Sequence, residues 1–461
     1  MKFFEVVSFL SFLGNVLSDK TCVVDAGSTG SRLRCYDYLL DAITSSVSIS
    51  TLFDQEVTPG LQNVQEADIP TYVTRLYNGA DLYQDVTQYW ASTAGMRTMD
   101  PQKQARYYDS VTGTLNTLGF NHVTAETISG EQEGLYDSYS IHYLASDHVY
   151  NVCDLGGQSL ECVYATDAVY GKTLYAVDSM ISNQTETLAS QTYLTGGQDA
   201  TRFVFSDYEQ CFPKNYPMPD DGVNKGGCLE NVQDYLVGQI LDVNLDVLPE
   251  KNQTYYLISG FYYAYAALVY NNTNVPASFP FDINELRRGY TRYCNTDWNI
   301  IAQNKDDYAN TYCFNGQYID ALFTALFSDV SDSQFIVDKK LGNPLQSVSW
   351  ALGYIYAVAT NTTSTRLPEP PPTSMPTISP TKEPSSNSDA GFSHVLLNIF
   401  VSLGVAIVSG TIGLALGARN PEKVSSVFKA CGCGFFFPVR ARTDYMLLDE
   451  ESSCMSMTSN T

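Results

Sequence analysis

The sequence has few basic residues and little charge overall. Its 461 residues include 26 Lys and Arg against 50 Asp and Glu, so the formal net charge is −24, and charged residues make up only 16% of the chain. A chain this acidic repels polyanions, and we therefore expect no nucleic acid among its partners. Hydrophobic residues make up 44%, which is typical of a folded protein, and the length allows two or three domains.

The sequence also lacks the CxxC motif with nearby histidines that is typical of a metal cluster. Eight cysteines precede residue 314, and an even number is typical of disulfide bonds in an oxidising compartment. Proximity favours two pairs, Cys211 with Cys228 and Cys294 with Cys313.

The segment from Asp25 to Arg32, with the sequence DAGSTGSR, predicts a phosphate-binding hairpin. Its glycines let the backbone turn tightly with several N–H groups directed at one point. Asp25 is expected to hold a hydrated divalent metal ion. For this loop alone, an ordinary glycine-rich hairpin is the simpler interpretation. The candidate phosphate ligands are Ser28, Thr29, Gly30, Ser31 and Arg32.

A second segment, from Asp154 to Ser159 with the sequence DLGGQS, repeats this pattern. Its candidate phosphate ligands are Gly156, Gly157 and Gln158, and Asp154 is a second candidate for the metal ion. Two strand–Asp–Gly hairpins far apart in one chain resemble the actin-like phosphotransfer architecture, in which two lobes share a cleft. We therefore expect an α/β fold of two actin-like (ribonuclease H-like) lobes around a phosphate-binding cleft.

Four further cysteines flank these hairpins. Cys22 and Cys35 lie on either side of the first, and Cys153 and Cys162 lie on either side of the second. Each pair either bridges its hairpin or remains as two buried thiols, and the sequence leaves both interpretations open.

Alternating strand-like and helix-like segments divide the chain into two lobes. Residues 19–145 are predicted to form lobe I, as a mostly parallel sheet with crossover helices. Residues 146–345 are predicted to form lobe II with the second hairpin. An apolar helix at 346–362 is predicted to return to lobe I.

The two ends of the chain predict secretion and a single membrane anchor. Residues 1–18 have an early positive charge and a short apolar run, which favours a cleaved signal peptide over an uncleaved anchor. A Pro/Ser/Thr-rich stalk at 363–393 precedes an apolar run at 394–418 that is long enough to span a bilayer as a transmembrane helix. The basic residues of the tail, 419–461, indicate a type I protein with its head in the lumen or outside the cell.

Two kinds of short motif agree with this placement. Four Asn-x-Thr sequons predict glycosylation, at Asn183, Asn252, Asn271 and Asn361. Tyr445 begins a tyrosine-x-x-apolar motif in the tail, which is the form that sorting adaptors bind. The Golgi, the endolysosome and the cell surface are the compartments that we expect.

Five segments, in this order and spacing, resemble the nucleoside phosphatase family of apyrases and nucleoside diphosphatases. They are Asp25–Arg32, Ser92–Arg97, Ser129–Gly134, Asp154–Ser159 and Ser349–Gly353. The first is more similar to the Golgi and plant members than to the vertebrate cell-surface members. The resemblance implies nucleoside di- or triphosphate substrates and Ca²⁺ or Mg²⁺ as the cofactor.

The family's chemistry implies that water attacks the terminal phosphorus in line, without a phosphoenzyme. Glu133 would be the general base, although a carboxylate in the first turn of a helix also stabilises the helix dipole. Asp25 and Asp154 would hold the metal ion mainly through its water molecules. The two hairpins would hold the phosphates.

The resemblance implies supporting roles for four more residues. Thr93 and Ser159 would orient the attacking water. Arg97 would support the cleft rather than touch substrate. Trp350 would lie near the hydrated metal ion, or would simply be a core tryptophan.

Three positions depart from the family's usual pattern. Ser138 and His142 stand where Trp and Asn are usual, and Glu161 stands where Gln is usual. An ionised carboxylate at position 161 cannot donate a hydrogen bond to water, and it adds negative charge beside a polyphosphate. Either acidic neighbours raise the pKa of Glu161 and keep it protonated, or it points away toward Cys162.

The sequence therefore predicts a membrane-anchored apyrase that hydrolyses nucleoside tri- and/or diphosphates to lower phosphates and orthophosphate. Among enzymes, the alternative is an exopolyphosphatase-like or sugar-kinase-like protein, which the secretory topology and the segment at Glu133 disfavour. From another class, a non-catalytic nucleotide-binding receptor or adhesion protein on the same fold remains open.

Overall fold

The computed structural model describes most of the chain between residues 16 and 367. The described residues are 16–41, 44, 46–145, 150–168, 173–179, 184–218, 227–240, 249–304, 306–327, 330 and 332–367. Residues 1–15, Asn183, the predicted membrane span at 394–418 and Tyr445 lie outside them. In the described part of the chain, none of the helices is long and apolar enough to cross a membrane.

Lobe I is built on a five-stranded mixed sheet in the order β3-β2-β1-β4-β5. Its strands are β1 (Val16–Ala26), β2 (Ser31–Asp41), β3 (Ser46–Val57), β4 (Thr87–Ser92) and β5 (Val123–Thr127). β1 pairs with β2, and β2 with β3, in antiparallel fashion, whereas β4 is parallel to β1 and to β5. The prediction of a mostly parallel sheet is wrong here, because the short turn between β1 and β2 reverses the chain and produces an antiparallel pair.

Two helices cover the outer face of this sheet, α2 (Ile69–Leu76) and α4 (Pro101–Thr117). In α2 the buried residues Ile69, Tyr72, Val73 and Leu76 follow the three- and four-residue spacing of one helix face. α4 begins where the side chain of Asp100 accepts hydrogen bonds from two backbone N–H groups of the first turn. The short helix α3 (Ala94–Arg97) follows β4 directly.

Lobe II is built on an eight-stranded sheet in the order β11-β12-β10-β6-β7-β9-β8-β15. Its strands are β6 (Val152–Leu155), β7 (Ser159–Ala165), β8 (Leu174–Ser179), β9 (Gln184–Leu194), β10 (Thr254–Ser259), β11 (Ser278–Pro280), β12 (Gln334–Asp338) and β15 (Thr363–Arg366). The helices of this lobe are α6 (Gln198–Val204), α7 (Cys228–Tyr235), α8 (Gly260–Tyr270), α9 (Ile283–Cys294), α10 (Trp298–Ile301) and α11 (Tyr312–Phe327). One apolar cluster joins residues of α7, α8, α9 and α11 to the sheet.

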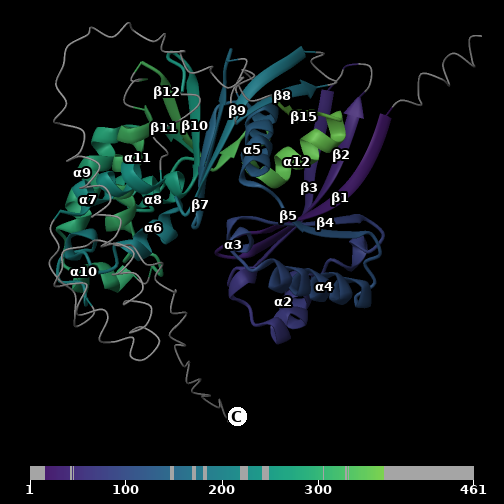
Figure 1. Cartoon of the computed structure of the whole chain (residues 1–461), viewed down its shortest axis with the longest axis horizontal. Helices are drawn as coiled ribbons and strands as arrows, with labels where there is room; N and C mark the ends of the chain where they lie inside the picture. The colour runs from purple at the N-terminus through teal and green to yellow at the C-terminus, as the bar shows by residue number, and fades with distance from the viewer. Residues whose placement is uncertain are drawn as a thin grey trace, which may run out of the picture. The chain divides into compact units, whose positions relative to one another are not determined.

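Two helices lie between the two sheets, α5 (Gly130–Leu144) and α12 (Trp350–Thr360), as Figure 1 shows. A single apolar cluster joins them to residues of both sheets, among them Val23 and Tyr36 of lobe I and Val152 and Val163 of lobe II. α12 contacts α5 and the strands β1, β2 and β3. The strand that follows it, β15, pairs with β8 of lobe II. The end of the described chain therefore connects both lobes.

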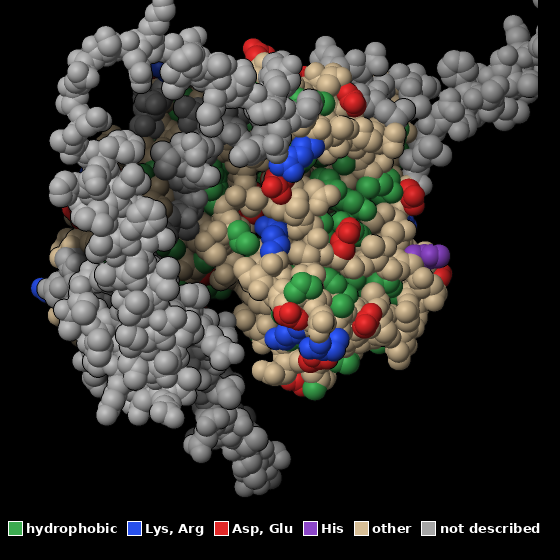
Figure 2. All heavy atoms as spheres, in the orientation of Figure 1, with side chains coloured by type: hydrophobic (Ala, Val, Ile, Leu, Met, Phe, Trp, Pro, Cys, Tyr) green, Lys and Arg blue, Asp and Glu red, His purple; other side chains and the backbone are tan. Residues whose placement is uncertain are grey.

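The described surface seen in Figure 2 has few Lys and Arg side chains, and most of them lie beside Asp or Glu side chains. Arg106 with Glu66 is an ion pair of this kind. Exposed pairs of this type contribute little to stability, but they leave few cations free to meet an anionic ligand.

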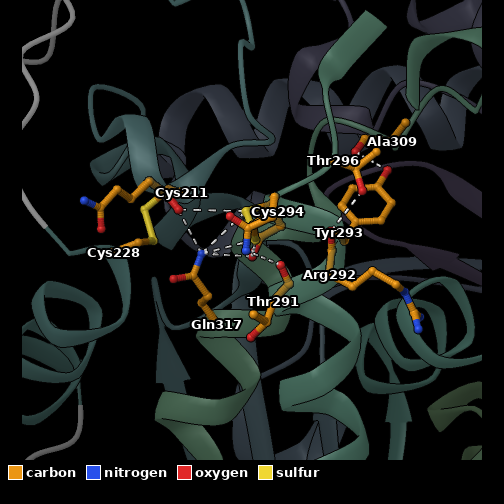
Figure 3. Close-up of a disulfide and its surroundings, with 12 residues drawn as sticks. Cys211, Cys228, Thr291, Arg292, Tyr293, Cys294, Thr296, Ala309 and Gln317 are labelled. Carbon is orange, nitrogen blue, oxygen red and sulfur yellow. Dashed lines mark hydrogen bonds between the residues drawn. A yellow bond between two sulfur atoms is a disulfide. The ribbon is translucent and has the colours of Figure 1, made fainter. Parts of the chain in front are cut away.

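Four disulfide bonds form among the described cysteines. The pairs predicted from proximity, Cys211–Cys228 and Cys294–Cys313, are confirmed. Figure 3 shows the side chain of Gln317 near them, where its amide donates to the carbonyl of Gln210.

Each phosphate hairpin is also bridged by a disulfide. Cys22 bonds Cys35, and Cys153 bonds Cys162, between residues that lie directly opposite each other on paired strands. The bridge, rather than the pair of thiols, is therefore the correct alternative for both hairpins.

Candidate functional site

Each phosphate hairpin places an aspartate at the end of its first strand, opposite a charged residue on its second strand. Asp25 lies opposite Arg32, and Asp154 lies opposite Glu161. Asp25 Oδ2 is 3.8 Å from Arg32 Nη1, and Arg32 Nη2 is closer, at 2.9 Å, to Glu56 Oε1. The two aspartates are half-buried. The hairpins are therefore alike in their acids but differ in the residue that faces each acid.

The tips of the two hairpins meet at Gly157. A Cβ atom at this position would lie 2.8 Å from Ser28 Oγ and 3.3 Å from Thr29 Cγ2 of the first hairpin. It would also lie 2.8 Å from Asp199 Oδ2 of α6. Only glycine leaves room for this approach. The fold thus brings the two predicted phosphate-binding turns to one place, as the sequence predicts.

The first hairpin is supported by the segments around it. The side-chain amide of Gln62 donates to the carbonyl of Ser28 at 2.6 Å. The backbone N–H of Thr93 donates to the carbonyl of Ala26 at 3.2 Å, so the segment Ser92–Arg97 lies directly beside the hairpin. The side chain of Thr93 is buried, that of Ser28 is half-buried, and that of Thr29 is exposed.

Arg97 connects the two lobes at the centre of the site. Its Nη2 donates to Glu133 Oε2, and its Nη1 donates to Glu161 Oε1 at 3.1 Å. Its Nε donates to the carbonyl of Ile128 at 2.9 Å, which fixes the guanidinium plane. Thr192 also donates to Glu161 Oε1, at 3.1 Å. The expectation that Glu161 points away from the site is therefore wrong, because two donors hold it inside.

Glu133 and Glu161 come together because α5 lies close against β7. A Cβ at Gly134 would be 3.0 Å from Val163 Cγ2 and 3.5 Å from Glu161 Cβ. α5 begins at Gly130, where the side chains of Ser129 and Gln132 each accept from the other's backbone N–H. Glu133 therefore lies in the first turn of the helix.

Burial and crowding change the acidity of these carboxyl groups. Burial raises the pKa of Glu133 above its usual range, Glu161 adds to the shift, and Arg97 opposes it. Burial also raises the pKa of Glu161, and Arg97 opposes that shift. Burial and the Glu133 carboxyl raise the pKa of Asp154 to about 7. Close to neutral pH, the site therefore contains carboxyl groups that exchange protons easily.

A family model of known proteins matches residues 18–215, and its description is "GDA1/CD39 (nucleoside phosphatase) family". The matched region contains both hairpins, Arg97, Glu133 and Glu161. Residues 18–215 form a nucleoside phosphatase domain of this family. The match thus confirms the resemblance for the four segments that it contains, and the fifth, Ser349–Gly353, lies outside it.

Individual proteins agree with the family match. The chain is similar to ectonucleoside triphosphate diphosphohydrolase 1 of Bos taurus, with 20% identity over 76% of this chain and 82% of that protein. It is 21% identical to ectonucleoside triphosphate diphosphohydrolase 3 of Homo sapiens over 77% of this chain and 82% of that protein. It is 27% identical to probable apyrase 1 of Oryza sativa subsp. japonica over 44% of this chain and 48% of that protein.

Solved structures share the fold at low sequence identity. A crystal structure of nucleoside triphosphate hydrolases from Neospora caninum aligns with a TM-score of 0.56 and 11% identity, over 78% of this chain and 96% of that chain. A Ppx/GppA family member from Aquifex aeolicus aligns with a TM-score of 0.50 and 16% identity, over 75% of this chain and 99% of that chain. These likenesses concern the fold, and they support the two-lobed α/β architecture.

Asp137 is a residue of the nucleoside phosphatase domain that the sequence reasoning missed. It lies on α5 one turn after Glu133, and it is completely buried. No N–H or O–H group of the described residues donates to either of its carboxyl oxygens. Burial and then the charge of Asp154 raise its pKa well above the usual range. The spacing of Asp137 from Glu133 could have indicated its position, because residues four apart on a helix lie on the same face.

Ser259 is a second missed residue. It ends β10, beside the strand that carries Asp154, and its backbone has a φ of 57° and a ψ of −114°. A non-glycine residue in this conformation is strained, and such strain is concentrated at functional sites. A hydrogen bond from the Ser259 side chain lowers the pKa of Asp154, against the effect of burial. No local sequence pattern predicts such a backbone conformation.

Ser31 lies differently from what the sequence suggests, and Trp350 takes the core position that was one of its two alternatives. Ser31 is fully buried and its hydroxyl accepts a hydrogen bond from Tyr72 at 2.9 Å, so its side chain faces the core rather than a phosphate. Trp350 is buried in the apolar cluster between the sheets. Its indole N–H has no acceptor among the described residues.

The remaining predicted residues lie along the second hairpin. Gly156 and Gln158 are half-buried, and Ser159 is buried next to Glu161. The carbonyl of Gly156 accepts from Gln198 N at 3.0 Å, so the start of α6 supports this turn.

Proposed function

We propose that this protein is a nucleoside tri- and diphosphate phosphohydrolase. Two features of the structure carry the proposal. The two phosphate hairpins meet at Gly157, and Arg97 holds Glu133 by a hydrogen bond. The family match supports it, and proteins similar to this chain are named apyrases and ectonucleoside triphosphate diphosphohydrolases.

In the proposed reaction, Glu133 is the general base. A water oxygen attacks the terminal phosphorus, its proton passes to Glu133, and the bond from this phosphorus to the bridging oxygen breaks. Arg97 donates to Oε2 of Glu133, so we assign the proton to Oε1. The raised pKa of Glu133 makes the carboxylate a stronger base than an ordinary glutamate.

The hairpins and their neighbours hold the substrate in this proposal. Ser28, Thr29 and the backbone N–H groups of Gly30, Gly156 and Gly157 bind phosphate oxygens. Thr93 and Ser159 orient the attacking water. Arg97 is a positioning residue, because each of its three nitrogens donates to Glu133, Glu161 or the carbonyl of Ile128.

The acids of the site fit a divalent cation that is held mainly through its water molecules. Asp25 and Asp154 lie at equivalent positions of the two hairpins, and burial and the nearby Glu133 carboxyl raise the pKa of Asp154, so a cation would favour its ionised form. Among the described residues, no three acidic, histidine or cysteine side chains converge closely enough to hold one metal ion directly. We propose that Asp25 and Asp154 hold Ca²⁺ or Mg²⁺, which would neutralise charge on the phosphate oxygens.

We also propose that the protein is a single-pass type I membrane protein of the Golgi, the endolysosome or the cell surface, with sorting adaptors binding at Tyr445. The support is the apolar run at 394–418 and the basic residues after it. Three of the predicted glycosylation sites, Asn252, Asn271 and Asn361, are exposed, as glycan attachment requires. The disulfide bonds also suit an oxidising compartment.

Glu133→Gln tests this proposal. We expect phosphate release from ATP, ADP, GDP and UDP to fall by roughly 10²–10⁴, because a positioned general base contributes about this much. Glu131→Gln is the matched control, since Glu131 lies in the same helical turn; this variant should retain normal turnover. EDTA should abolish the wild-type activity. Normal turnover in Glu133→Gln, or activity that EDTA does not reduce, would contradict the proposal.

A further inference from the structure

A pocket of about 340 Å³ lies away from the two phosphate hairpins. One wall is formed by β2 and β3 of lobe I, and the other by the hairpin of β13 (Lys340–Leu341) and β14 (Gln346–Ser347). No residue of Asp25–Arg32 or Asp154–Ser159 is among its lining residues. The pocket is therefore separate from the two phosphate hairpins, at the place where the chain leaves lobe II for α12.

The pocket is unusual in this acidic chain because two cations line it. The Arg34 side chain is only 15% exposed, and its contacts are long, with Nε 3.3 Å from Asp54 Oδ2 and Nη1 3.4 Å from Ser349 Oγ. The Tyr36 hydroxyl is a third partner of Arg34, and Asp54 also lines the pocket. A guanidinium has five N–H donors, so these three contacts still leave donors for a ligand. Lys340 is exposed, and no carboxylate of the described residues is within ion-pair distance of it.

An acceptor without a donor lies in the same pocket. The side-chain Nε2 of Gln346 donates to the carbonyl of Ile49 at 3.2 Å, which fixes the orientation of the amide. Its Oε1 is buried, and no group of the described residues donates to it. Buried polar atoms normally have a partner. The missing partner is therefore a donor that a ligand or a water molecule supplies.

We propose that this pocket binds a phosphate group, either as free orthophosphate or as the phosphate of a nucleoside monophosphate. The phosphate oxygens accept from Arg34 and Lys340, and a P–OH or ribose O–H donates to Gln346 Oε1. Apolar surface at Leu345, which is 60% exposed, offers a contact for a nucleoside. The inference rests on the proposed function only for the choice of ligands, which are the products of that reaction.

Lys340→Glu tests the proposal, with Lys339→Glu as the matched control. Lys339 precedes Lys340 directly, but its ammonium lies over the rings of Tyr262 and Tyr263, and it does not line the pocket. The full-length protein is purified in detergent with EDTA, and orthophosphate and AMP are titrated in separate calorimetric experiments. We expect Lys340→Glu to weaken binding by at least about tenfold and Lys339→Glu to leave it unchanged.

The outcomes separate the two ligand sources. Tighter binding of AMP than of orthophosphate, lost in Lys340→Glu, would identify the nucleotide as the ligand; equal binding would identify the phosphate alone. Thermal unfolding without ligand should be the same in both variants, since both lysines are exposed. Undetectable binding, or equal binding in Lys340→Glu and wild type, would overturn the proposal. Absence of hydrolysis in the wild type would refute the proposed function but not this binding.

Discussion

Arg97 is the residue on which the charge balance of the site depends. Five carboxyl groups interact in one region: Asp25, Glu133, Asp137, Asp154 and Glu161. Arg97 pairs with two of them, Glu133 and Glu161. Arg32 lies 3.8 Å from a third, Asp25. Because two guanidiniums cannot neutralise five carboxylates, the others must take up protons or face an added cation. The raised pKa values and the proposed metal ion are two consequences of this imbalance.

Glu161→Gln should change how activity depends on pH. Burial raises the pKa of Glu161, so in the wild type this group becomes ionised as the pH rises through neutrality. The new negative charge then opposes polyphosphate binding, and the wild-type rate should fall. Glutamine cannot ionise, so the variant should keep its rate and exceed the wild type by roughly threefold or more at about pH 8.

The measurement is kcat/KM for ADP from pH 5 to 9 in the two proteins. We expect the optimum of the variant to lie at higher pH. Superimposable profiles would mean that Arg97 and Thr192, which both donate to Glu161, keep it ionised throughout.

Asp137→Asn should stabilise the protein at high pH. Burial raises the pKa of Asp137 in the folded state, so above the unfolded pKa of about 4 the folded protein binds more protons than the unfolded chain. The stability of the wild type therefore falls as the pH rises toward the folded pKa. Asparagine removes this effect, and Tm should exceed that of the wild type by roughly 2 °C or more near pH 8.

Thermal unfolding at pH 5, 6.5 and 8 tests this expectation, and the gap in Tm should widen with pH. Asp109→Asn is the control, because Asp109 is exposed on α4, and the same change there should leave Tm unaltered. A gap that narrows with pH would show that Asp137 is stabilised as a carboxylate.

At the scale of single elements, the two bridged hairpins are what the sequence predicts best. Their glycines, acids and flanking cysteines are local features, and local features determine a turn between two short strands. The partner of Glu161 was not predictable in this way, because Arg97 is 64 residues away in the chain. The prediction that Ser31 binds phosphate was wrong for a related reason. Residues alternate between the two faces of a strand, and only the whole sheet decides which face belongs to the core.

Gly157→Ala should disturb the contact between the two hairpins. The added methyl group would lie 2.8 Å from Ser28 Oγ and 2.8 Å from Asp199 Oδ2, so these side chains must turn away, and the Ser28 hydroxyl is then displaced from the phosphate site. We expect kcat/KM for nucleotides to fall by roughly 10²-fold, since small misplacements at a site are this costly. Steady-state kinetics with ATP and ADP give the measurement.

Gly113→Ala on α4 is the control, because a Cβ there meets nothing within 4 Å. It should leave kinetics unchanged and stabilise the helix by roughly 1 kcal/mol. Normal kinetics in Gly157→Ala would show that the hairpins do not act together.

At the scale of the whole molecule, the two lobes are joined by shared packing and not only by the chain. α5 and α12 contribute to one apolar cluster with residues of both sheets, and Arg97 and Glu161 form an ion pair between the lobes. The sequence predicted that a late helix lies with lobe I, but it gave no sign that the next strand, β15, pairs with lobe II. β15 is short and exposed, and no apolar pattern marks such a strand.

This pairing decides where the head of the protein ends. β15 pairs with β8, and the backbone N–H of Leu367 donates to the carbonyl of Leu174 at 2.8 Å. A chain cut after Leu367 should therefore be secreted from eukaryotic cells as a soluble, glycosylated and active enzyme. A chain cut after Asn361 lacks β15 and exposes the edge of β8, so its Tm should be lower and its yield smaller. Phosphate release is measured in the medium and in the membrane fraction; recovery of the longer chain in membranes would mean that residues 1–18 are an uncleaved anchor.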